Sequence, residues 1–151
     1  MLRAQLTDAL KTAMKAKNDR AVSTVRLILA ALKDRDIAAR TKGNPDGITD
    51  DEIRSMMQNM IKQRRESMAL YEQGGRCELA QQEAEEITII EGFLPKQLSD
   101  SDIQAAAKAL ITEIGAAGIK DMGRTMAAMK QRYAGQMDFS KASLVVKQLL
   151  A

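Results

Sequence analysis

Proline occurs at only two of the 151 positions, Pro45 and Pro95, and glycine occurs at nine. Proline removes a backbone donor and clashes with the preceding helical turn, so long stretches of this chain are free to be helical. The remaining composition agrees, since strong helix formers such as Ala, Leu, Lys, Gln and Glu dominate it. The sequence therefore predicts an all-α fold.

Apolar residues recur three and four positions apart before Pro95, the spacing of helices that bury one face. This spacing predicts four helices. A glycine- and proline-containing loop, residues 43–47, separates the second from the third. Thr49 and Glu52 fit a capping box at the start of the third. The expected helices cover about 2–16, 21–40, 50–73 and 77–93.

Pro95 disfavours helical geometry at Leu94 and marks a boundary. Beyond it, three short helices are expected. Ser99 with Asp102 repeats the capping pattern at the first, Asp121 can cap the second, and Asp138 or Ser140 caps the third. The predicted organisation is an N-terminal helical module, residues 1–94, followed by a three-helix tail module, residues 95–151. Short connections of this kind favour a compact helical unit.

The net charge of +3 is distributed unevenly. Residues 1–42 carry ten basic and four acidic side chains, residues 43–94 carry five and eleven, and residues 95–151 carry eight and five. This separation either steers acidic partners such as RNA to the two basic segments or reflects neutralisation between packed helices.

A single cysteine, Cys77, excludes an intramolecular disulfide. The first residues have no apolar run of signal-peptide length, and no stretch has the roughly 18 apolar residues of a membrane span. We therefore expect the cytoplasm, or an equivalent reducing compartment, and no membrane association.

Histidine is absent, which removes the commonest general base and the commonest metal ligand. The chain also lacks a Walker-type phosphate loop, a dinucleotide-binding glycine motif and a serine nucleophile elbow. Cys77 has no histidine to activate it and is interpreted as a bystander. We expect no catalytic residue, no metal site and no cofactor.

Charged residues interrupt the apolar faces of the third and fourth predicted helices. Arg64 lies on or beside the buried stripe of the third helix, and Glu83 and Glu86 lie within that of the fourth. An unpaired buried charge is costly, so Arg64 is predicted to pair with Glu83 or Glu86. The alternative is that Arg64 binds a ligand.

Two further groups are candidates for binding. Gly74, Gly75 and Arg76 precede the fourth helix, where free amides and an Arg could hold an anion, although helix termination alone also explains the glycines. Scattered basic residues of the tail module could contact RNA phosphates, or could simply be solvated. These RNA-binding candidates are Lys120, Arg124, Lys130, Arg132, Lys141 and Lys147.

Several short segments, in this order and spacing, resemble the GatB/YqeY family. The segments are Met14–Lys17, Val25–Ile28, Lys62–Ser67 with Tyr71, Gly75–Arg76, Phe93–Ser99 and Asp121–Gly123. The resemblance spans nearly the whole chain. It implies a relation to the helical and tail regions of the B subunit of tRNA-dependent amidotransferase, whose tail region is associated with holding tRNA.

Three functions follow as expectations. The first is a non-catalytic accessory protein that binds tRNA or related structured RNA through residues 95–151, without DNA specificity. The second is a helical adaptor with a protein partner. The third, implied by the resemblance alone, is a carbon–nitrogen ligase with glutamine as amido donor, acting within a complex. The ATP- and metal-using domain of the amidotransferase B subunit has no counterpart in these 151 residues.

Overall fold

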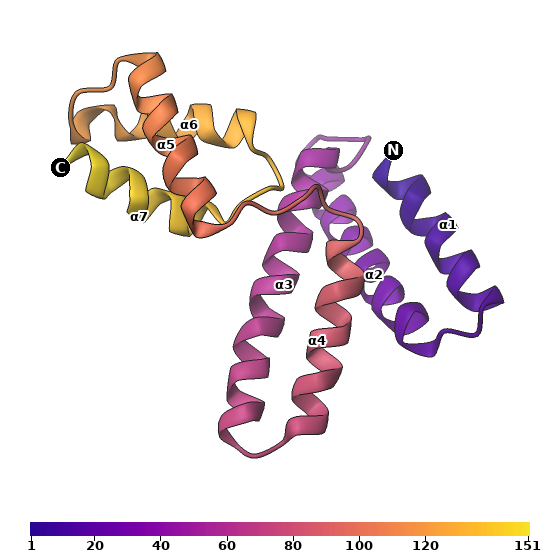
Figure 1. Cartoon of the computed structure of the whole chain (residues 1–151). Helices are drawn as coiled ribbons and strands as arrows, with labels where there is room; N and C mark the ends of the chain where they lie inside the picture. Colours follow the sequence, from indigo (N-terminus) through magenta and orange to yellow (C-terminus); the bar gives the residue numbers. More distant parts are fainter. The chain divides into compact units, whose positions relative to one another are not determined.

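The computed structural model describes residues 1–151 and contains helices but no strands, which confirms the all-α prediction. Its contacts divide the chain into two compact units, Met1–Leu94 and Pro95–Ala151 (Figure 1). No helix combines the length and apolar character needed to cross a membrane. The first unit holds α1 (Leu2–Lys15), α2 (Asp19–Thr41), α3 (Asp50–Gln73) and α4 (Cys77–Glu91). The second holds α5 (Asp100–Ile114), the 3-10 turn η1 (Ile119–Asp121), α6 (Met122–Arg132) and α7 (Phe139–Leu150).

Side-chain caps define several of the helix starts. Thr49 and Glu52 form the expected capping box at α3, and Ser99 forms a second one with Asp102 at α5. Asn18 accepts from the amide of Ala21 at the start of α2. Each cap satisfies backbone donors that have no partner within the helix.

One predicted cap is wrong. The side chain of Asp121 makes no capping hydrogen bond to α6. Its carboxylate accepts instead from the amide of Ala117, at 2.9 Å, in the turn before η1. The 3-10 turn that precedes α6 directs this side chain back toward the chain entering it, and the sequence pattern did not predict that turn.

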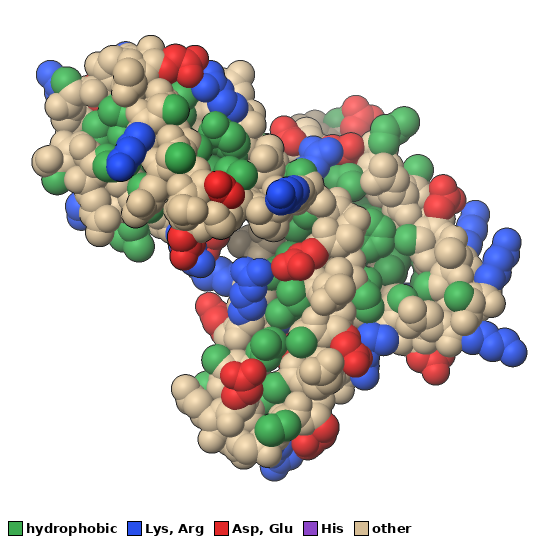
Figure 2. All heavy atoms as spheres, in the orientation of Figure 1, with side chains coloured by type: hydrophobic (Ala, Val, Ile, Leu, Met, Phe, Trp, Pro, Cys, Tyr) green, Lys and Arg blue, Asp and Glu red, His purple; other side chains and the backbone are tan.

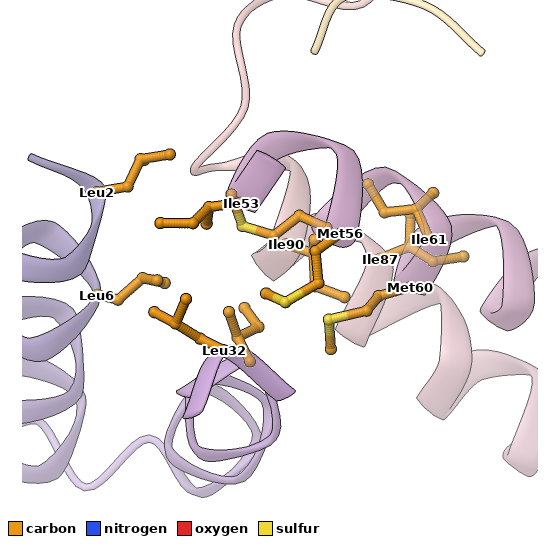
Figure 3. Packing of buried hydrophobic residues seen from close by; sticks show 11 residues of the cluster. Leu2, Leu6, Leu32, Ile53, Met56, Met60, Ile61, Ile87 and Ile90 are labelled. Carbon is orange, nitrogen blue, oxygen red and sulfur yellow. The ribbon is translucent and has the colours of Figure 1, made fainter. Parts of the chain in front are cut away.

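The core of the first unit is aliphatic and thioether-rich. Leu2 and Leu6 project from α1 toward Leu32 of α2 and Ile53 of α3 (Figure 3). Burial of such side chains stabilises the fold by roughly 1.5–3 kcal/mol each. Methionines of α3, at positions 56, 57 and 60, belong to the same buried cluster.

α3 packs most extensively against α4. The most deeply buried side chains of α3 lie between Ile53 and Ile61, and those of residues 62–73 are at most partly buried. The first half of α3 therefore supplies most of its share of the core, and the second half adds partly buried side chains such as Met68.

The second unit has its own core, formed by α5, α6 and α7. Leu110, Met129 and Val146 are fully buried within it. Tyr133 and Phe139, the two aromatic residues of this unit, are partly buried against this cluster. The chain entering α5 is held to the same unit, because the Leu98 amide donates to the Gln136 carbonyl at 2.8 Å.

Candidate nucleic-acid interface and other candidate sites

All six basic residues predicted to contact RNA are exposed on the second unit. Lys120 belongs to η1; Arg124, Lys130 and Arg132 belong to α6; and Lys141 and Lys147 belong to α7. On the face in view, Figure 2 shows the basic side chains of this unit separated by acidic and uncharged ones.

Carboxylates neutralise three of these six cations. Arg132 forms a bidentate salt bridge with Glu113, with hydrogen bonds of 2.7 and 2.9 Å. Arg124 lies 3.3 Å from Asp121, and Lys141 lies 3.8 Å from Asp100. The Arg132 guanidinium holds the pKa of Glu113 below its usual value, so this pair stays ionised at neutral pH.

Three of the candidates, Lys120, Lys130 and Lys147, form no ion pair with a carboxylate. Two other exposed lysines of the unit, Lys96 and Lys108, also have none. Exposed, unpaired ammonium groups are the ones available to phosphate. These five lysines, and not all six predicted residues, are therefore the side chains left available for an acidic ligand.

The candidates on α6 do not share one helix face. Residues of an α-helix advance by about 100° each, which places Lys130 about 120° and Arg132 about 80° from Arg124, in opposite directions around α6. The basic residues therefore spread around the unit and do not form a ridge along α6.

A groove of about 290 Å³ lies between α5 and α7. Ile103, Leu144 and Val145 give it an apolar lining, and the Lys141–Asp100 pair lies at its border. Leu144, one of these lining residues, is 64% exposed.

Gly74, Gly75 and Arg76 lie where α3 ends and α4 begins. Their amides all donate to the last carbonyls of α3: Gly74 to Leu70, Gly75 to Glu72, and Arg76 to Tyr71. Gly75 has a φ of +73°, the left-handed geometry common after helices. These three amides are therefore not free to hold an anion, and only the exposed Arg76 side chain remains available.

Arg64 and Glu86 form a largely buried ion pair between α3 and α4, with Arg64 Nε 2.9 Å from Glu86 Oε2. Arg64 also donates to the carbonyl of Met60 at 3.1 Å. Glu83, the other predicted partner, makes no ion pair. Burial, with the nearby Glu86 charge, raises the pKa of Glu83 above its usual value, although Arg64 opposes this rise.

A second polar network was not predicted. Arg3 donates to both carboxylate oxygens of Asp36, at 2.6 and 3.2 Å, and to the carbonyl of Ile48 at 2.7 Å. The Ile48 amide donates back to Asp36 at 2.9 Å. Asp36 thus joins α1, α2 and the loop before α3. Its position in an otherwise apolar stripe was the sequence signal.

The remaining candidates for chemistry are isolated. Cys77 is exposed at the start of α4. No group of three or more acidic or cysteine side chains lies close enough together to hold a metal ion.

Residues 3–150 match the family described as Yqey-like protein. The chain belongs to the Yqey-like protein family. Three relatives share the name "Altered inheritance of mitochondria protein 41, mitochondrial". Those from Lachancea thermotolerans and Eremothecium gossypii are each 30% identical over 113 residues, which cover 74% of this chain and 58% and 60% of the relatives. The protein from Clavispora lusitaniae is 31% identical over 109 residues, covering 71% of this chain and 61% of that protein.

This Yqey-like chain thus spans about three fifths of the length of the curated relatives it matches. Their names contradict the cytoplasmic location expected from the sequence, because each is a mitochondrial protein. A lone cysteine excludes an intramolecular disulfide, but it does not identify a compartment.

Proposed function

We propose that this Yqey-like protein is a non-catalytic accessory protein that binds tRNA or a related structured RNA through residues 95–151. The observation that carries the proposal is the set of five exposed lysines in this unit that pair with no carboxylate. These are Lys96, Lys108, Lys120, Lys130 and Lys147.

The arrangement of charge favours contact with phosphates over reading of bases. The unit has only two aromatic side chains, Tyr133 and Phe139, and both are packed against its core. Stacking of single-stranded bases is therefore not supported. Lysines spread around a small helical unit suit the shaped backbone of a folded RNA. The resemblance of residues 95–151 to the tail region of the amidotransferase B subunit, associated with holding tRNA, supports the same proposal.

A gel-shift or filter-binding titration of the full chain with bulk tRNA tests the proposal. Binding should weaken as salt rises, because phosphate contacts release counterions. Replacing Lys120, Lys130 and Lys147 together with Ala should reduce the slope of log K against log salt by about 2–3.

A triple replacement of Lys11, Lys15 and Lys17, exposed residues of the first unit, makes a control with the same loss of charge. This control should bind tRNA almost as well as the wild type. Absence of binding at low salt, or an equal loss in both triple variants, would contradict the proposal.

A protein adaptor is the second candidate, favoured by the exposed Leu144 at the groove between α5 and α7. An exposed leucine beside an apolar groove is typical of helix recognition. A pull-down with the full chain should then return a discrete partner that survives RNase, and Leu144→Ser should release that partner. Loss of the partner on RNase treatment would leave the RNA proposal alone.

A further inference from the structure

A second groove, of about 350 Å³, lies between α1 and α2 in the first unit. Arg3 and Thr7 border it on α1, and the buried Leu32 and Asp36 lie at its base. Its border on α2 alternates apolar and basic side chains along one stripe: Leu29, Lys33, Ile37 and Arg40.

The two basic residues of this stripe, Lys33 and Arg40, are seven positions apart, and Arg26 lies seven positions before Lys33, just outside the lining of the groove. Arg26, Lys33 and Arg40 are all exposed, and none pairs with a carboxylate. Seven residues fall only about 20° short of two full helical turns, so the three cations form a nearly straight row. Arg40 is oriented by a hydrogen bond from its Nε to the Pro45 carbonyl, at 3.3 Å.

The groove has no free negative charge. Asp36 is the only acidic residue that lines it, and Arg3 neutralises that carboxylate at 2.6 Å. Basic side chains also project from the outer side of α1, toward the right of Figure 2. The row on α2 therefore lies in an electropositive part of this unit, which attracts acidic ligands.

Apolar side chains lie between the cations. Ile37 is 51% exposed, and Leu29 is partly buried at the edge of the core. On α1, the stripe that contains Arg3 and Thr7 continues by helical spacing to Leu10 and Met14, and Met14 is 51% exposed. A phosphate backbone gains nothing from these aliphatic surfaces. The apolar face of another helix is stabilised by covering them.

We propose that the groove between α1 and α2 binds an acidic amphipathic helix of a partner protein. Acidic residues of that helix, spaced by seven, would face Arg26, Lys33 and Arg40, while its aliphatic residues would cover Leu29 and Ile37. This is the helix-in-groove mode, in which charged flanks set register and an apolar seam supplies affinity. The proposal concerns a different unit and a different ligand from the RNA-binding proposal.

The test is a fluorescence anisotropy titration of the full chain with a labelled 21-residue peptide. The peptide has Leu at the heptad a and d positions and Glu at e and g. One control peptide replaces every Glu with Lys, and another has the same composition with the heptad scrambled. The acidic heptad peptide should bind, and both controls should bind at least about tenfold more weakly.

Three variants locate the site. Lys33→Glu with Arg40→Glu should weaken peptide binding by about tenfold or more. Lys11→Glu with Lys15→Glu changes the net charge equally on another exposed face of α1 and should change binding by less than about threefold. Ile37→Ser, which leaves the charge intact, should weaken binding severalfold.

A parallel titration with labelled tRNA separates this proposal from the RNA-binding one. The Lys33→Glu, Arg40→Glu variant should lose the peptide and retain the tRNA. No binding of the acidic peptide to the wild type, equal losses in the groove variant and the α1 control, or loss of tRNA with retention of the peptide would each overturn the proposal.

Discussion

Arg64 Nε donates to Glu86 Oε2 at 2.9 Å between α3 and α4, and the two side chains are only 14% and 11% exposed. A second hydrogen bond, from Arg64 to the carbonyl of Met60, holds the guanidinium in place. An ion pair so shielded from water stabilises the fold only while both partners are present. Its replacement therefore has different consequences when one or both members are changed.

Glu86→Ala leaves the Arg64 charge buried without its partner. We expect the free energy of unfolding to fall by about 3 kcal/mol, measured by urea denaturation. The double variant Arg64→Met, Glu86→Leu should recover most of that loss, because no unpaired charge remains. Equal destabilisation of the single and double variants would contradict this account.

Glu83→Gln is expected to stabilise the protein at neutral pH. Burial, with the nearby Glu86, raises the pKa of Glu83, so the folded state disfavours its charged form. Above the raised pKa this charge opposes folding, and the opposition disappears as the pH falls through that value. Urea denaturation at several pH values should show a gain that shrinks toward acid. Glu66→Gln, at an exposed position of α3, should show no such trend.

Asp36→Asn should destabilise the first unit by about 1–2 kcal/mol at neutral pH. Hydrogen bonds from Arg3, then from the Ile48 amide, lower the pKa of Asp36 from its usual 3.8. The stabilisation is complete above the usual pKa and is lost as the pH falls through the lowered value. Denaturation curves of wild type and variant should therefore converge in acid. A constant difference in the free energy of unfolding at every pH would show that the charge of Asp36 is not the cause of the stabilisation.

Gly47→Ala should destabilise the protein more than Gly43→Ala does. Both glycines have positive φ, +79° and +96°, so both changes incur the left-handed penalty of roughly 1–2 kcal/mol. A Cβ at Gly47 would also collide with the Asp36 carboxylate, whereas a Cβ at Gly43 meets nothing within 4 Å. Melting temperatures of the two variants measure the difference. Equal temperatures would show that the loop before α3 adjusts freely.

Thr24→Val should stabilise the protein by about 1 kcal/mol. Thr24 is fully buried in α2, and its hydroxyl has no hydrogen-bond partner. Valine has nearly the same shape and removes the unpaired hydroxyl. Thr24→Ser, which keeps the hydroxyl and removes the methyl, should instead destabilise the protein. In thermal unfolding, the melting temperature should rise for Thr24→Val and fall for Thr24→Ser, relative to the wild type.

Local patterns in the sequence predicted the helices because their determinants lie close together along the chain. The capping box at Thr49 joins residues three positions apart, and the structure contains it. Such patterns could not decide whether Glu83 or Glu86 pairs with Arg64. The two residues share one face of α4, and only the rotation of that helix against α3 decides which carboxylate meets Arg64.

Long-range pairs explain what the sequence did not show about the candidate sites. Arg132 was predictable as an exposed cation, but its partner, Glu113, lies 19 residues earlier on another helix. The partners of Asp36 are Arg3 and Ile48, which are 33 and 12 residues away. Periodicity predicts which face a residue occupies, and it cannot predict what faces it from another helix.

The burial pattern of α3 has a consequence for motion in the first unit. Since the apolar side chains of residues 62–73 are at most partly buried, the outer turns of the hairpin formed by α3 and α4 can separate while the aliphatic cluster around Ile53 and Ile90 stays intact. Such partial openings require less free energy than loss of the whole fold. The largely buried Arg64–Glu86 pair lies near the border of this region. At that point the pair holds α3 and α4 together.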